Sequence, residues 1–417
     1  MQVAEGYKQT EVGVIPEDWG TCKLSDISKK ITDGDHATPI RTESGYYLLS
    51  ARNILNSKIS VSDVDYVGLS EYNRMRGRCA PDVGDILISC SGTIGRIAIV
   101  PKKFECVLVR SAALVQISES EMDSRFIKFW LQSPKGQHLI NNSVNQGAQP
   151  NLFINHIEKL SSPLPPSLAE QEAIAEALSD ADSLIESLQQ LIAKKRQIKQ
   201  GAMQELLQPK DDWVEKTFDE VFSFYSTATN SRSDLSIQGD SYYIHYGDIH
   251  TKFHSHLDFA ENSPPKIDRS KCKGATAIKN GDWIMADASE DYDGVGKSVE
   301  VTNLPEGVSA VAGLHTFLLR EKEPYFVEGF KGHLGNLRSL HEEFLRVATG
   351  MKVYGVSKAA LRGLNVPIPP TTEQTRIATI LSDMDSEITA LETKLTKAQQ
   401  IKQGMMSELL TGKTRLV

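Results

Sequence analysis

Two stretches of this chain have residue types and spacings that could do chemistry. The first is 294–298, Gly-Val-Gly-Lys-Ser, which ends like the phosphate-binding loop of nucleotide hydrolases. That loop begins with a glycine, and this chain has Asp291 at the corresponding position. The matching stretch of the first half, 93–96 (Thr-Ile-Gly-Arg), has the same glycine-then-cation ending without the motif. We therefore interpret 294–298 as a turn between two strands.

The second stretch is a cluster of four histidines, His245, His250, His254 and His256. Imidazoles can bind zinc, but no cysteine or carboxylate stands at a recognisable ligand spacing, and only one half of the chain has the cluster. The five cysteines are scattered and form no Cys-x-x-Cys motif, so disulfides and a cysteine-based zinc site are disfavoured. We expect no metal site, although an enzyme with an unrecognised site in this segment stays open as a third interpretation.

Catalytic motifs are also missing elsewhere in the chain. The sequence contains no Gly-x-Ser-x-Gly, no His-Glu-x-x-His and no Asn/Asp-Pro-Pro-aromatic motif of an amino-methyltransferase. Each absence is weak by itself. Together they favour a binding protein without catalytic residues.

Small basic clusters are the remaining candidate binding groups. The net charge of −8 argues mildly against a nucleic-acid partner, because phosphate binding favours basic surfaces. Two clusters are nevertheless locally basic: Arg74, Arg76 and Arg78, and Arg269, Lys271 and Lys273. A locally basic cleft on an acidic protein is compatible with DNA binding, and solvated surface charge is the alternative for each cluster.

A long internal repeat fixes the elements that must position these groups. The segment 170–210 returns as 373–413 with roughly half of its positions identical, including the blocks Leu-Ser-Asp, Ile-Lys-Gln-Gly and Glu-Leu-Leu. The repeat extends outward, since Asp-Trp at 18–19 matches Asp-Trp at 212–213. Such a duplication predicts a two-armed molecule with an internal pseudo-two-fold relation.

Each half combines a mixed globular region with one long helix. Short β-type runs such as 86–89 and helical patches at 124–133 and 338–348 predict an α+β fold for the globular regions. Proline-rich breaks at 163–166 and 367–370 end them, because proline cannot continue a ladder or a helix. The predicted division is 1–165, 166–208 (first helix), 209–368 and 369–417 (second helix).

The apolar residues of both helices recur at alternating steps of four and three, which is typical of a coiled-coil seam. They are Ile174, Leu178, Ala181, Ile185, Leu188 and Ile192, and Ile377, Leu381, Met384, Ile388, Leu391 and Leu395. Neither helix can bury its stripe alone, so we expect the two to pair antiparallel and to hold the globular regions apart. The alternative is that each helix packs on a separate partner.

Bulk properties are those of an ordinary soluble protein, with 40% hydrophobic and 24% charged residues. No apolar run approaches the ~20 residues of a membrane span, and residues 1–13 lack the layout of a signal peptide. We expect a cytoplasmic protein without membrane contact.

The sequence resembles the specificity (S) subunit of a Type I restriction-modification system over essentially its whole length. The segments that carry the resemblance are 14–19 (VIPEDW), 33–40 (DGDHATPI), 84–100 (GDILISCSGTIGRIAIV), 164–182 and 368–385. In the last two, prolines precede Glu-Gln and a helix with Leu-Ser-Asp, and this signature occurs twice. The second half departs from the pattern, because DASEDYDGVGKSVEV stands where the first half has a stretch ending in GTIGRIAIV.

The resemblance implies two mixed α/β target recognition domains separated by two long antiparallel coiled-coil helices. Each domain would read one half of a bipartite site in double-stranded DNA, and the helices would set the spacing. The subunit would be non-catalytic and would scaffold two methyltransferase (M) subunits and restriction (R) subunits. Those partners would bring S-adenosylmethionine, ATP and Mg²⁺, with no cofactor in this chain, to methylate adenine or cleave unmodified DNA.

We predict DNA-facing residues from charge, hydrogen-bonding capacity and position in these segments. In the first half they are His36, Thr38, Arg52, Asn53, Arg74, Arg76, Arg78, Ser91, Thr93, Arg96, Gln146, Gln149 and Asn151. In the second half they are His245, Tyr246, Arg269, Lys271, Lys273 and Lys297. For His36 and Asn53 a turn-forming role is the alternative, and the amide-rich loop at 145–151 has the same alternative. A two-armed protein–protein adaptor without DNA reading is the alternative function, and it would explain the acidity better.

Overall fold

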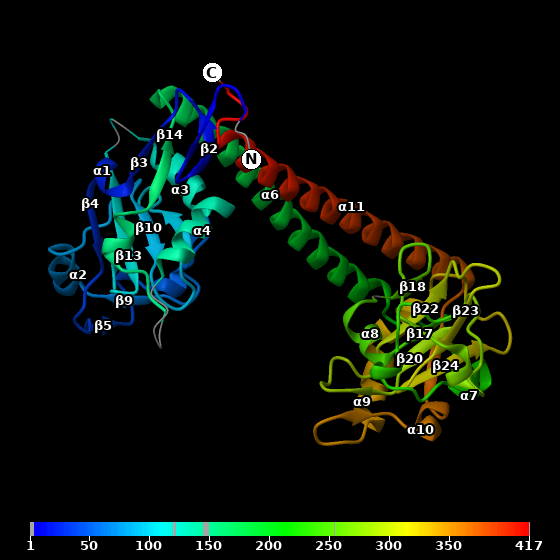
Figure 1. Cartoon of the computed structure of the whole chain (residues 1–417). Helices are drawn as coiled ribbons and strands as arrows, with labels where there is room; N and C mark the ends of the chain where they lie inside the picture. Colours follow the sequence, from blue (N-terminus) through cyan, green and yellow to red (C-terminus); the bar gives the residue numbers. More distant parts are fainter. Residues whose placement is uncertain (1–3, 119, 121, 145–149, 254, 417) are drawn as a thin grey trace. The chain divides into compact units, whose positions relative to one another are not determined.

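Two helices of 39 residues each, α6 (Leu168–Leu206) and α11 (Thr371–Leu409), stand out in the computed structural model (Figure 1). The structure describes residues 4–118, 120, 122–144, 150–253 and 255–416. It divides into a first unit, residues 1–189 with 393–417, and a second unit, residues 190–392. Each long helix therefore contributes one part to each unit.

The first unit is built on two four-stranded sheets. One is antiparallel, in the order β11 (Ile97–Ile99), β10 (Ile86–Ser89), β13 (Ala112–Ile117) and β4 (Ser28–Asp33). The other has the order β12 (Cys106–Leu108), β6 (Tyr46–Leu49), β9 (Asp65–Val67) and β5 (Arg41–Thr42), with β12 parallel to β6. The two-stranded pairs are β1 (Tyr7–Thr10) with β2 (Gly13–Pro16), β3 (Gly20–Lys23) with β14 (Ser161–Leu164), and β7 (Ile54–Leu55) with β8 (Lys58–Ile59).

Short helices accompany the sheets of this unit. They are α1 (Leu24–Ile27), η1 (Ala51–Asn53), α2 (Leu69–Arg76), α3 (Ser124–Gln132), α4 (Pro134–Ser143) and α5 (Ile154–Ile157). Asp123 caps α3 by accepting hydrogen bonds from two backbone N–H groups, and Ser133 caps α4 with Pro134 at its first position. The helical patch predicted at 124–133 is therefore confirmed.

The second unit repeats this topology with different sequence. Its five-stranded sheet has the order β16 (Phe222–Tyr225), β24 (Thr316–Glu321), β20 (Trp283–Ala286), β22 (Ser298–Thr302) and β18 (His256–Asp258). A three-stranded sheet has the order β19 (Lys266–Ile267), β17 (Ser241–Ile244) and β23 (Ser309–Ala312), with β23 parallel to β17. The pairs are β15 (Val214–Thr217) with β26 (Asn365–Ile368), and β21 (Ala288–Ser289) with β25 (Tyr354–Gly355). The order β22-β20-β24-β16 thus matches β11-β10-β13-β4 of the first unit.

The remaining helices of the second unit are short. They are α7 (Phe218–Val221), η2 (Arg232–Asp234), α8 (Tyr246–Thr251), η3 (Arg269–Cys272), η4 (Lys331–Asn336), α9 (Arg338–Val347) and α10 (Lys358–Arg362). The α9 helix confirms the helical patch predicted at 338–348. Phe344 of α9 lies in the core of this unit with Trp283 of β20 and Phe218 of α7.

Each long helix begins inside the core of one unit. Ile174 and Leu178 of α6 are fully buried in the main core of the first unit, together with Leu409 at the end of α11. Ile377 and Leu381 of α11 are fully buried in the corresponding core of the second unit. Burying an aliphatic side chain contributes about 1.5–3 kcal/mol, so the apolar stripe fixes each helix start to its globular region.

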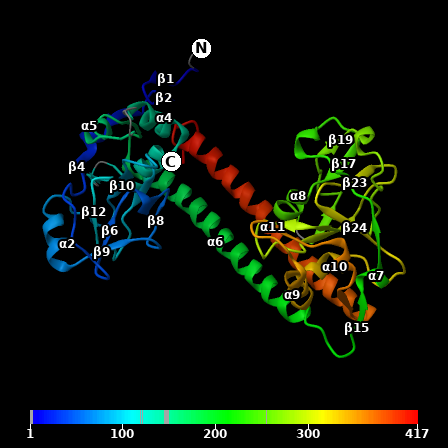
Figure 2. The same cartoon turned by 90° about the horizontal axis from the view of Figure 1, so that it is seen from below.

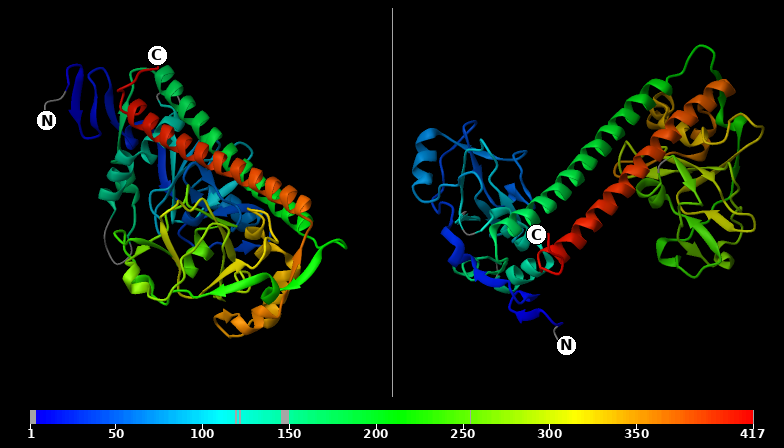
Figure 3. Two further views of the ribbon diagram at one scale, coloured as in Figure 1. Left: turned by 90° about the vertical axis from the view of Figure 1, so that its right-hand side faces the viewer. Right: turned by 90° about the horizontal axis from the view of Figure 1, so that it is seen from above.

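The helices α6 and α11 lie side by side and antiparallel (Figures 1 and 2). In the first unit Lys402 of α11 donates to Asp182 of α6, and in the second unit Lys199 of α6 donates to Asp385 of α11. These are equivalent positions of the repeat, and the two residue numbers of each pair add up to the same total. That equality is what one antiparallel register requires. Figure 3 shows the two helices from two further sides.

Farther along the same interface, the predicted seam residues point inward. Leu188, Ile192 and Ile388 are 5–8% exposed, while Ile185, Met384, Leu391 and Leu395 are half-buried. Since the seam steps by four and three, its burial is the geometry expected for two paired helices.

The repeated Glu-Gln motif anchors the start of each long helix. Glu170 is 1% exposed and accepts from Arg415, which follows α11, and Arg415 also donates to Asp18 at 3.0 Å. Glu373 correspondingly accepts from Lys210, which follows α6. The start of each helix is therefore tied to the residues that follow the end of the other.

Among the described residues, no helix has the length and apolar character needed to cross a bilayer.

Candidate nucleic-acid interface

A cleft of about 910 Å³ opens in the first unit at the ends of several strands. It is lined by three of the predicted DNA-facing residues, His36 after β4, Ser91 after β10 and Asn151 before α5. A β-bridge joins Ser91 to Asn151, and Leu152 N donates to Cys90 O at 2.9 Å. These contacts bring segments far apart in the sequence to one concave surface, where small molecules and polymers commonly bind.

A triangle of charged groups borders this cleft. Asp33 Oδ1 accepts from Arg78 Nη2 at 2.6 Å, while its Oδ2 lies 2.6 Å from His36 Nε2. The guanidinium of Arg78 also lies 3.2 Å from His36 Nε2. Burial raises the pKa of the Asp33 carboxyl, but the hydrogen bonds from His36 and Arg78 outweigh it and hold that pKa below its usual value. Arg78 is therefore largely neutralised by Asp33.

The other predicted arginines of the basic cluster are also paired with carboxylates. Arg74 Nη2 lies 2.5 Å from Asp35 and 2.8 Å from Glu71, and the hydrogen bonds that Arg74 donates to Glu71 and Asp35 raise its pKa. Arg76 Nη2 lies 2.9 Å from Asp82. The run 74–78 therefore does not present three free positive charges, as its sequence suggested.

Arg52 and Asn53 belong to one folded loop. Arg52 lies 3.1 Å from Asp65 and 3.4 Å from Asp63, at the exposed surface. Asn53 is 2% exposed, accepts from Ser50 N at 2.9 Å and donates to two backbone carbonyls of the same loop. An amide that is buried and satisfied cannot read a base edge, so the DNA-facing prediction for Asn53 is corrected to a structural role.

The other predicted DNA-facing residues of the first unit lie in different environments. Thr38 and Thr93 are exposed on loops, and Arg96 is half-buried after the turn, with its backbone N donating to Ser89 Oγ at 2.9 Å. Gln146 and Gln149 lie outside the described residues.

Arg110 lines the cleft but was missed by reasoning from the sequence. It is exposed, and in the described part of the chain no carboxylate lies within ion-pair distance of its guanidinium. The available signal was a cation two residues after the end of the buried strand β12.

In the second unit a cleft of about 970 Å³ is lined by residues of α6 and α11, by Tyr246 and Lys297, and by most of the stretch 289–298 between β20 and β22. Lys297 Nζ donates to His250 O at 2.7 Å. The stretch 294–298 is therefore a turn leading into β22, as interpreted from the sequence. The same cleft contains the acidic residues Glu290, Asp291 and Asp293, so its surface is of mixed charge.

Three histidines of the predicted cluster, His245, His250 and His256, take part in structural hydrogen bonds. His245 caps α8, with Nδ1 accepting from Gly247 N at 3.0 Å, and burial lowers its pKa. His250 Nε2 lies 2.9 Å from Ala288 O, and His256 Nε2 lies 2.9 Å from Gly329 O. Across the described ranges, which omit His254, no three metal-ligating side chains gather.

The basic cluster of the second unit lies on η3, outside the cleft. Arg269 donates to Cys272 O and Ala275 O, both at 2.7 Å, and so holds its own turn together. Lys271 and Lys273 are exposed. They remain available to a polyanion, whereas the guanidinium of Arg269 is largely used.

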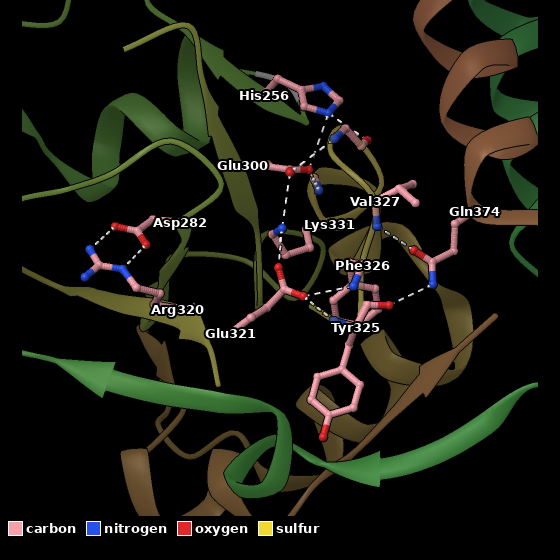
Figure 4. A network of polar contacts seen from close by, with 12 residues as sticks. His256, Asp282, Glu300, Arg320, Glu321, Tyr325, Phe326, Val327, Lys331 and Gln374 are labelled. Atoms are coloured by element: carbon pink, nitrogen blue, oxygen red, sulfur yellow. Dashed lines mark hydrogen bonds and ion pairs between the residues drawn. The ribbon is translucent and has the colours of Figure 1, made fainter. Parts of the chain in front are cut away.

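A buried charge network supports the second unit from within (Figure 4). Lys331 is 3% exposed and lies 2.6 Å from Glu321 and 3.4 Å from the fully buried Glu300. Burial lowers the pKa of Lys331, but the two carboxylates outweigh this and raise it. The backbone N–H groups of Gly329 and Gly332 donate to the oxygens of Glu300. Because its charges are compensated in this way, the network is structural.

Gln374 links α11 to the same region. Its Oε1 accepts from Val327 N at 2.8 Å, and its Nε2 donates to Tyr325 O at 3.0 Å and to Pro369 O at 2.8 Å (Figure 4). Gln171 at the start of α6 accepts from Asp123 N at 3.0 Å. The Gln of each Glu-Gln motif therefore docks a long helix on the globular region that it follows.

Comparison with known proteins gives the family. The family described as "Type I restriction modification DNA specificity domain" matches twice, over residues 16–196 and 210–403. The chain is 24% identical over 441 residues to the "Putative type I restriction enzyme MjaX specificity subunit" of Methanocaldococcus jannaschii, covering 99% of this chain and 97% of that protein. It is 22% identical to the "Type I restriction enzyme MjaVIII specificity subunit" of the same organism, covering 99% and 96%.

A solved structure has the same fold. The S subunit of the Type I restriction-modification system from M. genitalium superposes with a TM-score of 0.59 at 14% identity, covering 98% of each chain. At this identity the likeness concerns the fold alone. The two family matches together span most of the 417 residues. The chain therefore belongs to the type I restriction modification DNA specificity family, and it is a specificity subunit, the non-catalytic DNA-recognition component of such a system.

Proposed function

We propose that this chain recognises a bipartite site in double-stranded DNA, with one half read by each unit. The observation that carries the proposal is the duplicated architecture, in which the ion pair of Lys402 with Asp182 recurs as Lys199 with Asp385. Two recognition units of the same topology but different surface residues are suited to two half-sites of different sequence.

One element shared by the two clefts supports this proposal. Each cleft includes the turn between a matching pair of strands, β10–β11 in the first unit and β20–β22 in the second. The residues on these turns differ, with Ser91 and Gly92 in one and Ser289 to Gly294 in the other. A conserved scaffold with different loops is a common way to vary specificity.

The cations without a carboxylate partner are suited to phosphate contacts, which fix the register of a protein on a duplex. In the described residues these include Arg96, Arg110, Lys271 and Lys273. The chain as a whole has a net charge of −8. Partner subunits therefore contribute part of the electrostatic affinity in this proposal.

The long helices support the proposed spacing function. A continuous 39-residue α-helix is about 58 Å long at ~1.5 Å per residue. A paired helix is stiff, so its length converts a distance between recognition units into a number of base pairs.

We further propose that two M subunits and R subunits assemble on this chain in the cytoplasm and supply S-adenosylmethionine, ATP and Mg²⁺. Apolar residues at the surface of α6 support such docking, since Leu191 is 39% and Ile198 is 46% exposed. Exposed aliphatic residues one heptad apart on a helix are suited to packing against a further helix.

The test is methylation mapping of DNA treated with the chain assembled with its methyltransferase partner and S-adenosylmethionine. The expected product is a single motif with two specified parts separated by an unspecified gap. A gel shift of the same complex should favour that motif over shuffled DNA. Assembly without any sequence preference would favour the adaptor interpretation and overturn the proposal.

A further inference from the structure

At the cleft of the first unit, the guanidinium of Arg110 is available to bind a ligand, because the neighbouring carboxylates already have cationic partners. Asp33 is a carboxylate of this cleft, and it is already occupied by Arg78 and His36, each at 2.6 Å. Asp35, nearby in the chain, is occupied by Arg74 at 2.5 Å. Arg110 lines the same cleft and, in the ranges that the structure describes, has no carboxylate partner.

The backbone that carries Arg110 is held on both sides. Arg110 N donates to Asp35 O at 3.0 Å, and the preceding Val109 N donates to Leu49 O at 3.0 Å. Ala112 N donates back to Val109 O at 3.0 Å, and a parallel β-bridge joins Asp35 to Val109. A fixed backbone with an exposed side chain lowers the entropy lost on binding, which is the arrangement expected of a recognition residue.

Amide side chains line the same cleft. Asn151 is positioned by its bridge to Ser91, and Asn155 lies exposed on the short helix α5. The ring of Phe153, 49% exposed, borders the cleft beside them. A guanidinium and carboxamides are the two groups that pair in bidentate fashion with guanine and adenine in the major groove.

We propose that Arg110 is a specificity-determining residue that reads a guanine in the half-site bound by the first unit. The assignment rests on the proposed function of sequence-specific DNA recognition. Its physical basis is that a planar guanidinium donates two parallel hydrogen bonds to O6 and N7 of guanine. A lysine keeps the charge of arginine but lacks this fork, so charge and base reading can be separated by substitution.

The experiment compares Arg110→Lys and Arg110→Gln with the unsubstituted chain in the complex with the methyltransferase partner. Methylation mapping gives the motif, and equilibrium binding at several salt concentrations gives affinity and salt dependence. The control is Arg125→Lys, because Arg125 is an exposed arginine of the same unit that is paired with Asp123 at 2.6 Å. Thermal unfolding of each variant shows whether it remains folded.

We expect Arg110→Lys to relax one guanine position, with discrimination falling by about fivefold to a hundredfold and binding to non-specific DNA nearly unchanged. Arg110→Gln should relax the same position and also weaken binding overall. The change should fall in one half of the motif, and Arg125→Lys should leave the motif intact.

Two results would overturn the assignment. One is an unchanged motif in both Arg110 variants that remain folded. The other is an equal loss of affinity for all sequences with a smaller salt slope, which would identify a phosphate contact. If the unsubstituted complex itself had no sequence preference, the proposed function would fail and the assignment with it, whereas a specific complex with a wild-type motif in both variants would remove Arg110 alone.

Discussion

Lys402 near the end of α11 donates a hydrogen bond to Asp182 of α6, across 220 residues of sequence. The side chains of Lys402 and Asp182 are 16% and 26% exposed, so the pair is largely removed from solvent. The repeat places the same pair, Lys199 with Asp385, in the second unit. A polar pair in an apolar seam fixes helix register, because any slip would separate the two charges from each other.

A double-mutant cycle should measure this pair. For Asp182→Asn, Lys402→Met and the double variant, we expect a coupling free energy of about 0.5–3 kcal/mol from thermal or urea unfolding. The cycle with Asp385 and Lys199 should give a similar value. The exposed pair of Arg338 with Glu342, 92% and 61% exposed, serves as control and should give at most about 0.5 kcal/mol. If the coupling free energy were equal in all three cycles, the two buried pairs would not fix the register of the helices.

Lys128 of α3 predicts a pH dependence of stability. Burial lowers its pKa from 10.5 to about 8, although Asp182 at 3.8 Å opposes the shift. Between these two pH values the unfolded chain binds more protons than the folded chain, so Lys128 makes stability rise with pH over that window, by up to about 3 kcal/mol.

The variant Lys128→Met should lose this rise, as measured by the free energy of unfolding at pH 8 and pH 10. The comparison is between variant and wild type, because burial raises the pKa of thiols such as Cys90 to about 12, which gives the opposite slope above pH 9. Parallel pH profiles for the two proteins would mean that Lys128 titrates normally.

Gln374 should be essential for docking α11 on the second unit. Substitution by Ala leaves Val327 N, Tyr325 O and Pro369 O without their side-chain partner, which costs about 2–4 kcal/mol in total. Thermal unfolding should show a clear loss, whereas Gln399→Ala at an exposed position of α11 should change stability by less than about 0.5 kcal/mol. If Gln374→Ala and Gln399→Ala both lowered stability by similarly small amounts, the anchoring role of Gln374 would be refuted.

Gly296 tests the interpretation of 294–298 as a structural turn. Its φ is +79°, and a Cβ there would lie 2.1 Å from the ring of Phe344. Gly274 also has a positive φ of +86° but open space around it. We expect Gly274→Ala to cost about 1–2 kcal/mol from backbone strain alone, and Gly296→Ala to cost a further 1–3 kcal/mol. Equal costs in urea unfolding would show that the Phe344 contact is unimportant.

Matched insertions test the proposed spacing function. Inserting one heptad into both α6 and α11, after Gln189 and after Glu392, lengthens each helix by about 10 Å, or roughly three base pairs. Methylation mapping should then show a longer unspecified gap with both half-sites retained. Insertion into one helix alone should shift the pairing of Lys402 with Asp182 and destabilise the chain. An unaltered gap in the matched variant would refute the proposal.

Much of this architecture follows from the sequence because its signals are local or repeated. The seam from Ile174 to Ile192 is visible as a period, and the prolines at 163–166 and 367–370 mark where the globular regions end. The duplicated Glu-Gln motif also indicated that one architecture occurs twice. Such patterns depend on helix geometry and backbone chemistry, which neighbouring residues determine.

Only the tertiary structure determines whether a polar side chain is exposed or already paired with another group. Arg74, Arg76 and Arg78 looked like a free basic cluster, yet each is paired with a carboxylate, and Asn53 is buried in its own loop. Arg110 was not among the residues predicted from the sequence to face DNA, but it lines a cleft. A charge is free or compensated according to its neighbours in space, and packing brings those neighbours from distant parts of the chain, as Glu170 and Arg415 illustrate.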